Sequence, residues 1–357
     1  MADHLVLAVN PGASSTKLAL FRGDAALREE RLEHPELAAR PAARVWDELP
    51  ARVAGVERFL AEADLPPGAV AAVVGRGGLL PPLASGTWAV NAVMLADLEA
   101  AARGEHASNL GAPIAKAVAD RQGCPAFVVD PVAVDELDPV ARVTGLAGVE
   151  RRSFTHALNL RAVARRFAAR EGRPLSAVRL VACHMGTGVS LAAFRDGRMA
   201  DVVNPMDEGP FSGDRAGAIP ATALLDLCFA PGADPVALRR RLFGDGGLYA
   251  HLGTRDAREA FARADRGDAR AALVLDAMTL GVAKSVGALA AALEGRVDAI
   301  LLTGGLARLE RIVEAVRRRV GWIAPVHVFP GEDELRALAE GALRVLRGDE
   351  AARAYPG

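Results

Sequence analysis

Residues 5–21 read LVLAVNPGASSTKLALF, and residues 180–195 read LVACHMGTGVSLAAFR. Each stretch passes from an apolar run through a short turn rich in Gly, Ser and Thr into a second apolar run. Short apolar runs bounded by turn residues are typical of buried strands. Asn10 corresponds to His184 and Gly12 to Gly186, so the pattern recurs about half a chain length later. This repeat predicts two domains of related topology, each opening with a strand–turn–strand unit.

The remaining segments alternate predicted strands with predicted helices, which gives an α/β fold class. A chain of 357 residues exceeds what one hydrophobic core usually serves. We therefore expect one domain over residues 1–150 and another over 151–329, with a helix in 330–357 joining the first. The predicted strands cover residues 70–74, 126–129, 199–203, 299–302 and 326–329, and the predicted helices cover 91–103, 107–121, 155–170, 269–293, 307–319 and 332–346.

The composition excludes several classes of protein. Lys and Arg number 43 against 44 Asp and Glu, a balance that argues against a nucleic-acid footprint or a polybasic membrane anchor. The clean apolar stretches, such as Val286–Leu293, are too short to span a bilayer, and no charged-then-apolar leader precedes the first strand. The 3 cysteines form no Cys-x-x-Cys pair, which makes a disulfide framework or a zinc site improbable. We expect a cytoplasmic protein without nucleic-acid or membrane partners.

Three turns are suited to binding phosphate, because a turn of Gly, Ser and Thr points backbone N–H groups into one concavity. A single turn of this kind is usually only a hairpin, and none here is a Walker P-loop. Their joint placement resembles that in sugar kinases, actin and chaperone ATPases, where two duplicated actin-like (ribonuclease H-like) domains close on a nucleotide. The candidate residues are Ser14, Ser15 and Lys17 in the first turn, Gly186, Thr187 and Gly188 in the second, and Gly304 and Gly305 in the third.

Longer motifs resemble the acetokinase family and, within it, the butyrate kinases. They extend nearly from end to end of the chain. The resemblance implies ATP/ADP and Mg²⁺ as cofactors, and reversible phosphoryl transfer between ATP and a short-chain carboxylate to give an acyl phosphate. It also implies a homodimer or a higher homo-oligomer. The matching stretches are NPGASSTK (10–17), VGRGGLL (74–80), EHASNLGA (105–112), VDPVAVDE (129–136), HALN (156–159), HMGTG (184–188), EGPFS (208–212), LTGGLA (302–307) and PGEDEL (330–335).

This chemistry determines which side chains are needed. A carboxylate with a pKa near ~4.5 is ionised at neutral pH, so the acceptor needs no general base, unlike the hydroxyl of a sugar. The enzyme must instead bring two anions together and neutralise the transferring phosphoryl group. Outside such motifs, an arginine is usually a surface residue and a helical histidine is usually structural. The expected catalytic residues are Arg76, His106, Asp130, His156, His184 and Arg215.

The resemblance assigns nucleotide contacts to the three turns and to an Asp-x-Arg motif at residues 256–258. Mg²⁺ is expected at Asn10 and Asp333, and the alternative for Asp333 is an acid at the start of a helix. The expected cofactor-binding residues are Asn10, Ser14, Ser15, Lys17, Gly186, Thr187, Gly188, Asp256, Arg258, Gly304 and Gly305.

Several positions depart from the pattern of acetate kinases. Arg76 stands where those enzymes carry His, and their substrate arginine falls at Val73 here, which favours the butyrate branch. A second histidine of the stretch around residue 156 falls at Leu160. Ala13 replaces a frequent Ser, and Thr187 replaces the Asn of acetate kinases or the Gly usual in butyrate kinases. The alternatives are a branched-chain, propionate or acetate kinase and, in another class, a non-catalytic ATP-binding actin-like protein.

Overall fold

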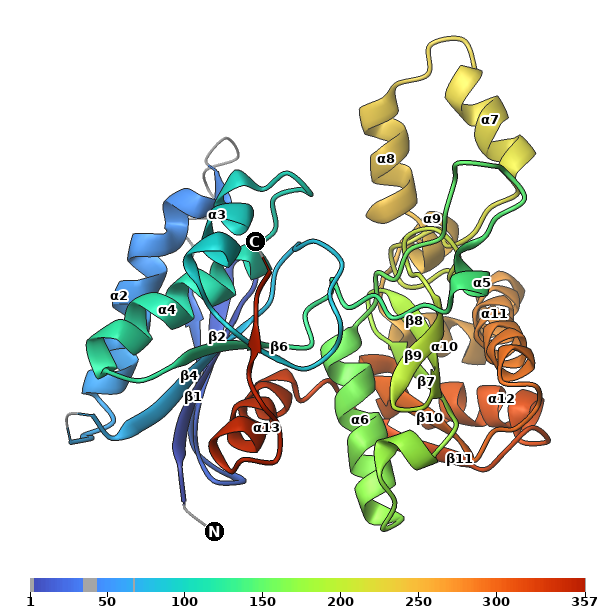
Figure 1. Ribbon diagram of the computed structural model, residues 1–357. Coiled ribbons are helices and arrows are strands. Elements are labelled where there is room, and N and C mark those ends of the chain that lie inside the picture. The colour runs from blue at the N-terminus through green and yellow to red at the C-terminus, as the bar shows by residue number, and fades with distance from the viewer. Residues whose placement is uncertain (1–2, 35–43, 67, 357) are drawn as a thin grey trace. The chain divides into compact units, whose positions relative to one another are not determined.

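The computed structural model describes residues 3–34, 44–66 and 68–356 (Figure 1). The chain divides into two compact units. The first unit is Met1–Asp135 together with Asp333–Gly357, and the second is Glu136–Glu332. The C-terminal segment therefore packs with the N-terminal one. The first boundary between the units follows Asp135, whereas the sequence suggested a boundary near residue 150.

A seven-stranded sheet forms the centre of the first unit, in the order β12-β5-β6-β4-β1-β2-β3. β1, β4 and β6 are parallel neighbours, and β2 and β3 continue antiparallel from β1. The inner strands are apolar and buried on both faces, as expected of parallel strands covered by helices. The strands are β1 (Leu5–Pro11), β2 (Ser15–Arg22), β3 (Ala25–Glu33), β4 (Val70–Arg76), β5 (Thr87–Ala89), β6 (Ala126–Val129) and β12 (Arg353–Ala354).

The five-stranded sheet of the second unit repeats this topology, in the order β11-β10-β7-β8-β9. β7, β10 and β11 are parallel neighbours, and β8 and β9 continue antiparallel from β7. The hairpin β7–β8 thus takes the place that β1–β2 takes in the first sheet. The predicted α/β class and the predicted duplication are confirmed. The strands are β7 (Leu180–Met185), β8 (Val189–Arg195), β9 (Arg198–Val203), β10 (Ala299–Gly304) and β11 (Val326–Pro330).

Helices cover the first sheet and complete its core. In Figure 1, α2 and α4 lie on one side of the sheet and the C-terminal α13 on the other. Phe59 of α2 and Ile114 of α4 are buried with Leu7 and Val73 of the sheet. The helical segments are η1 (Val45–Glu48), α2 (Leu49–Ala61), α3 (Ala92–Ala100), η2 (Ala107–Leu110), α4 (Gly111–Gln122) and α13 (Glu334–Leu346).

The second unit carries more helices, two of which project from it. Figure 1 shows α7 and α8 as a helical arm away from the second sheet, and no residue of either helix is buried. α6, α11 and α12 pack with the sheet or with one another. The segments are α5 (Pro139–Arg142), α6 (Ala157–Arg170), η3 (Leu175–Ala177), α7 (Ala221–Phe229), α8 (Pro235–Phe243), α9 (Gly247–Leu252), α10 (Ala257–Asp265), α11 (Ala269–Ala292), η4 (Gly305–Arg308) and α12 (Glu310–Val320).

α11 is the one helix of the described residues that is long and apolar enough to cross a membrane, judged by length and composition. Its Val274, Met278 and Val286 are buried in the core of the second unit, where the helix contacts β8 and α12. The core helix of a globular domain meets the same criterion of length and hydropathy. α11 therefore packs as a core helix.

The sequence located the long buried strands closely. In the first unit it missed β3 and α2, and also the short η1, β5 and β12. β3 (AALREERLE) is rich in charged residues and none of its residues is buried, so it lacks a buried apolar face. α2 contains Pro50 and Gly55, which weaken a helical pattern. The predicted helix over 107–121 begins as the 3-10 turn η2, and the one over 307–319 begins at Glu310 because Gly305–Arg308 forms η4.

Candidate active site

The predicted residues of the first unit gather at the carboxyl ends of its parallel strands. Asn10 lies near the end of β1, Arg76 ends β4, and Asp130 follows β6. β4 pairs with both β1 and β6, so these ends are neighbours along one edge of the sheet. Open α/β sheets bind their ligands outside this edge.

Asn10 and Arg76 meet at a carboxylate that the sequence did not single out. Asn10 Nδ2 donates to Glu334 Oε2 at 2.5 Å, and Arg76 Nη1 lies 3.0 Å from the same oxygen. Arg76 Nη1 also lies 3.3 Å from Asn10 Oδ1. Glu334 is the first residue of α13, so the return of the C-terminus to the first unit brings the carboxylate here.

This oxygen pair fits a hard cation. Mg²⁺ prefers carboxylate and amide oxygens and takes few protein ligands, because it keeps several waters. Asn10 Oδ1 and Glu334 Oε2 already face a positive group, the guanidinium of Arg76. Asp333, the predicted metal ligand, pairs instead with Arg336, Oδ2 to Nε at 3.2 Å. The described residues contain no group of three or more His, Cys, Asp or Glu that could hold a metal.

Asp130 and His106 occupy other positions in the first unit. Asp130 is buried at a left-handed φ of 38°, and its Oδ1 accepts from the backbone N–H of Gly86 at 2.7 Å. His106 is exposed before η2, where its Nδ1 lies 3.1 Å from the backbone N of Ser108. These contacts shape the local backbone.

The turn between β1 and β2 presents Ser14 and Lys17 to solvent and buries Ser15. Lys17 pairs with Asn10 across the two antiparallel strands. Directly opposed residues of an antiparallel pair project to the same face of a sheet, so Lys17 and Asn10 share a face. The first turn therefore combines backbone, hydroxyl and ammonium groups beside the Asn10 oxygen.

In the second unit, the ring of His184 contacts side chains of three other residues. Its Nδ1 lies 2.8 Å from Asn159 Oδ1, and its Nε2 lies 3.6 Å from Glu332 Oε1. The ring stacks on His156, with centroids 3.9 Å apart and planes 14° apart. His156 Nδ1 in turn lies 2.8 Å from Ser190 Oγ. The stack thus joins the residue before α6 to the carboxyl end of β7.

Asn159 sets which nitrogen of His184 carries a hydrogen. Asn159 Nδ2 donates to the backbone carbonyl of Glu332 at 2.8 Å. A carbonyl only accepts, so the amide oxygen must face His184, and that oxygen requires a hydrogen on His184 Nδ1. In the neutral ring Nε2 therefore carries no hydrogen. When the ring is the imidazolium ion, Nε2 carries one and can donate it to a phosphoryl oxygen.

Arg215 lies against the second turn. A Cβ on Gly188 would come within 2.5 Å of Arg215 Nη1, so the guanidinium covers this glycine closely. Ser212 is fully buried and joins the two segments, because its hydroxyl donates to the carbonyl of Thr187 and accepts from the backbone N of Arg215. Burial lowers the pKa of Arg215, and the charge of Asp214 opposes this effect. Arg215 stays a cation at neutral pH because its ordinary pKa is so high.

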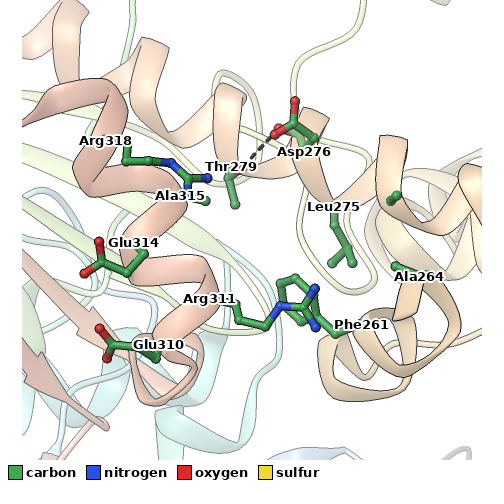
Figure 2. A pocket seen from close by; sticks show the side chains of 11 residues that line it. Phe261, Ala264, Leu275, Asp276, Thr279, Glu310, Arg311, Glu314, Ala315 and Arg318 are labelled. Atoms are coloured by element: carbon green, nitrogen blue, oxygen red, sulfur yellow. Dashed lines mark hydrogen bonds between the residues drawn. The ribbon is translucent and has the colours of Figure 1, made fainter. Parts of the chain in front are cut away.

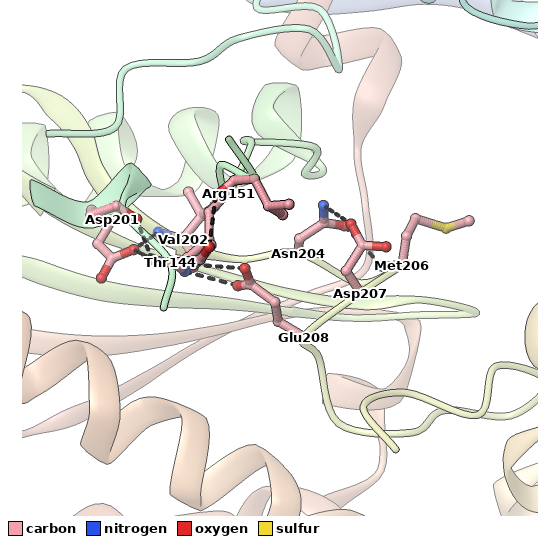
Figure 3. A network of polar contacts seen from close by, with 10 residues as sticks. Thr144, Arg151, Asp201, Val202, Asn204, Met206, Asp207 and Glu208 are labelled. Carbon is pink, nitrogen blue, oxygen red and sulfur yellow. Dashed lines mark hydrogen bonds and ion pairs between the residues drawn. The ribbon is translucent and has the colours of Figure 1, made fainter. Parts of the chain in front are cut away.

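An ion-pair network anchors the start of the loop that carries Arg215 (Figure 3). Arg151 binds both carboxylate oxygens of Glu208, at 2.6 and 2.8 Å, and Asp201 at 2.9 Å. It also donates to the carbonyl of Val202 at 2.6 Å. Hydrogen bonds to Glu208 raise the pKa of Arg151, while burial raises that of Asp207. A bidentate pair of this kind fixes the loop in one geometry.

The third turn requires glycine, and Arg258 of the Asp-x-Arg motif lines a cavity of the second unit. Gly304 has φ 89°, and a Cβ there would come within 2.4 Å of the Met185 carbonyl, so only glycine fits. Asp256 caps α10, and its hydrogen bond with Arg258 lowers the pKa of the Asp256 carboxyl. A cavity of about 360 Å³ is lined by Arg258, Phe261, Ala262, Asp265, Arg308, Leu309, Glu310 and Arg311. Of the predicted residues this cavity includes Arg258, and Arg308, three positions after Gly305, also lines it.

A larger cavity of about 410 Å³ lies among α10, α11 and α12 (Figure 2). It shares Phe261, Glu310 and Arg311 with the smaller one and contains none of the predicted residues. Its lining includes acidic and basic side chains, among them Asp276, Arg311 and Arg318, which Figure 2 labels. A mixed and water-exposed lining of this kind favours no single ligand class.

The geometry thus adds residues that the sequence reading missed. Glu334 is one position from the predicted Asp333, and the acidic run 332–334 gave no basis for choosing among its members. Asn159 lies inside the HALN motif, in which only the histidine was predicted to act. Ser212 ends another quoted motif. In each case the motif was identified and the contact that distinguishes its members is tertiary.

Comparison with known proteins gives one consistent family. The sequence pattern of the Acetokinase family matches residues 142–322. The chain is 44% identical over 353 residues to "Probable butyrate kinase" of Coprothermobacter proteolyticus, covering 98% of this chain and 99% of that protein. It is 43% identical to "Butyrate kinase 1" of Clostridium acetobutylicum, covering 99% of each.

A solved structure supports the fold. The acetate kinase of Porphyromonas gingivalis superposes with a TM-score of 0.80 at 22% identity, covering 96% of this chain and 100% of that one. A propionate kinase of Francisella tularensis gives a TM-score of 0.72 at 18% identity, covering 94% and 98%. From the family match and from relatives above 40% identity over nearly the whole length, we conclude that the chain belongs to the acetokinase family.

Proposed function

We propose that this protein transfers the γ-phosphoryl group of ATP to butanoate, giving ADP and butanoyl phosphate in a reversible reaction of short-chain fatty acid metabolism. The observation that carries the proposal is the identity of 43–44%, over nearly the full length, to proteins named as butyrate kinases. The geometry supports it, because both sheets present cationic and hydrogen-bonding side chains at their carboxyl edges.

The transfer needs no proton acceptor. A butanoate oxygen attacks the γ-phosphorus in line, the new O–P bond forms as the bond to ADP breaks, and ADP leaves with its charge. His184 and Arg215 donate to the equatorial phosphoryl oxygens, where negative charge must be neutralised. Arg76 binds a carboxylate or phosphoryl oxygen from the first unit. His156 supports His184 through the ring stack.

The nucleotide contacts follow the three turns. Backbone N–H groups of the first and second turns, with Lys17, bind phosphate oxygens. Asp256 and Arg258, with Gly304 and Gly305, contact adenosine beside the 360 Å³ cavity. Asn10 and Glu334 would hold Mg²⁺, which when bound neutralises charge on the phosphate oxygens; Asp333 is the alternative ligand. Roles for His106 and Asp130 remain predictions.

The test is acyl phosphate formation trapped as the hydroxamate, with acetate, propionate, butyrate, isobutyrate and isovalerate compared at saturating MgATP. We expect turnover to peak at butyrate. A methylene in an apolar pocket contributes only about 1–3 kcal/mol, so activity on neighbouring acids should overlap. A maximum at acetate or propionate would overturn the butyrate assignment within the family, and a maximum at isovalerate would assign a branched-chain acid kinase. Bound ATP with no product from any acid would favour the non-catalytic alternative.

We infer further that the protein works in the cytoplasm as a homo-oligomer, joined through the second unit. The arm α7–α8 exposes an apolar set, which we call the arm face: Ile219, Leu225, Phe229 and Val236. Phe229 is 80% exposed and Val236 77% exposed. Exposed apolar clusters of this kind mark protein–protein contacts, and a second copy of the chain always supplies a matching face.

A further inference from the structure

Arg52 of α2 is the largest fully buried side chain of the described residues, with none of its surface exposed. Its guanidinium binds the first turn. Nη2 donates to the carbonyls of Gly12 at 2.9 Å and Ala13 at 3.4 Å, and Nη1 donates to the carbonyl of Ser15 at 3.1 Å. Nη1 also donates to Thr16 Oγ1 at 2.9 Å. One side chain therefore contacts four of the five positions from Gly12 to Thr16, all but Ser14.

The remaining donors of Arg52 are taken by Glu48. Nε and Nη2 lie 2.9 and 2.7 Å from Glu48 Oε2, and the Glu48 side chain is only 15% exposed. A buried ion pair is an expensive way to stabilise a fold, because both groups lose their water. A requirement for one backbone geometry at the turn is a physical reason to keep such a pair.

The contacts fix which way the peptide groups of the turn point. In a trans peptide, the C=O and the following N–H point in opposite directions. The carbonyls of Gly12 and Ala13 point at Arg52, so the N–H groups of Ala13 and Ser14 point away from it. Ala13 and Ser14 are exposed. Two successive N–H groups directed to the exposed side form the concavity that binds an anion.

We propose that Arg52 is a positioning residue that holds the first turn in its phosphate-binding geometry from the buried side. It acts through the carbonyls of Gly12, Ala13 and Ser15 and touches neither ATP nor the carboxylate. This role rests on the proposed function, since it requires that the turn bind phosphate oxygens. Thr16 extends the brace, because its Oγ1 lies between Arg52 and His34 Nε2, the latter at 3.0 Å.

Arg52→Lys tests the proposal. Lysine keeps the charge beside Glu48, but its ammonium is a compact point charge and cannot reach the spread of acceptors that a planar guanidinium serves. We expect the dissociation constant for MgATP to rise about tenfold or more. This is the expected effect of losing one charge-assisted hydrogen bond between a backbone N–H of the turn and a phosphate oxygen. The dissociation constant for adenosine should stay unchanged, because adenosine lacks the phosphates that the turn would bind. Adenosine binding is measured by saturation-transfer NMR and ATP binding by calorimetry.

Arg28→Lys is the matched control. Arg28 also donates to α2, at the carbonyl of Phe59 at 3.2 Å, and pairs with Glu30 and Glu62. It braces the other end of the helix and does not contact the turn. Its replacement should lower stability without separating ATP affinity from adenosine affinity. A loss of ATP affinity equal to that of Arg52→Lys would overturn the proposal.

The remaining outcomes are distinct. Unchanged ATP affinity in Arg52→Lys, or parallel losses for ATP and adenosine, would leave Arg52 a structural residue only. Wild-type protein that binds no ATP would remove the proposed function itself. If Arg52→Lys does not fold, the wild-type protein decides: the backbone amide signals of Ala13 and Ser14 should shift on ATP addition in ¹⁵N NMR spectra. Signals that stay in place would overturn the proposal.

Discussion

Arg215 covers Gly188 of the second turn and is positioned through Ser212, which makes it our first candidate for a catalytic cation in the second unit. We expect Arg215→Ala to lower kcat roughly 10²–10³-fold, as loss of one preorganised donor to a charged transition state does. The dissociation constant for ATP should change little, because the turns supply most phosphate contacts. Steady-state kinetics and calorimetry measure the two effects. Arg240→Ala, on exposed α8, is the control and should retain full activity.

Glu334 and Asp333 are adjacent acids with different surroundings, which allows a matched test of the metal ligand. Glu334 lies 2.5 Å from Asn10, and Asp333 pairs with Arg336. We expect Glu334→Gln to raise the Mg²⁺ concentration for half-maximal activity at least about tenfold, as changes at metal sites commonly do. Asp333→Asn should shift it far less. The reverse order in a Mg²⁺ titration would return the ligand role to Asp333.

Asn159 fixes the tautomer of His184 through its two hydrogen bonds. In Asn159→Leu we expect the neutral ring to distribute its hydrogen over both nitrogens, because the acceptor at Nδ1 is gone. The imidazole ¹⁵N chemical shifts of His184 report this directly. kcat should fall about tenfold, because the imidazolium form of His184, which donates from Nε2, loses the hydrogen bond that Asn159 Oδ1 accepts from Nδ1. Unaltered ¹⁵N shifts would show that another group holds the tautomer.

At this scale the sequence predicted residue types better than contacts. Arg215, His184 and Asn10 were chosen by chemistry and motif, and each lies at a carboxyl edge or against a predicted turn. Arg52 could not be chosen, because it lies in a segment without a motif and its four turn contacts depend on how α2 packs. With 43 basic residues in the chain, nothing in the sequence indicates that this arginine is buried.

At the scale of elements, α13 is attached to the first sheet by a close approach at Gly341. A Cβ there would come within 2.4 and 2.6 Å of the methyl carbons of Val129 on β6. We expect Gly341→Ala to lower the free energy of unfolding by about 1–3 kcal/mol, the usual cost of overpacking a tight contact. Urea denaturation measures it. A value near zero would mean that α13 shifts freely on the sheet.

Gly287 of α11 is the matched control for Gly341. It also lies within a helix, and a Cβ there would meet no atom within 4 Å. Gly287→Ala should stabilise by up to about 1 kcal/mol, because alanine loses less backbone entropy in a helix than glycine does. If the two substitutions change the free energy of unfolding in opposite directions, the effect of packing is separated from that of helix propensity.

Elements with a buried apolar face were predictable, and elements without one were not. Apolar runs in the sequence mark β1, β4, β7 and β10, because both faces of each of these strands are covered. β3 has no such run, although it follows β2 as β9 follows β8. The duplication itself could have indicated β3, because Gly23-Asp24 stands after the first hairpin much as Asp196-Gly197 stands after the second.

At the scale of the whole chain, the repeated sheet explains why each unit carries some of the predicted site residues. Both sheets end three parallel strands at one edge, and the predicted residues fall there: Asn10 and Arg76 in the first unit, His184 and Gly304 in the second. The duplicated topology thus gives each unit one such edge. The sequence indicated this division because the turn residues repeat with the strands.

Self-association is the property of the whole molecule that the arm face predicts. Phe229 is 80% exposed at the end of α7, on an arm whose helices bury no residue within the unit. Burying an aromatic side chain of this size stabilises a contact by about 1.5–3 kcal/mol, and an aspartate in its place would have to lose its hydration. We therefore expect wild-type protein to elute as a dimer or larger assembly in size-exclusion chromatography with light scattering, and Phe229→Asp to shift it toward the 37.2 kDa monomer. Leu27→Asp, at a residue 49% exposed on β3 of the first unit, should leave the assembly intact. If Leu27→Asp dissociates the protein and Phe229→Asp does not, the copies meet through the first unit and the arm serves another purpose.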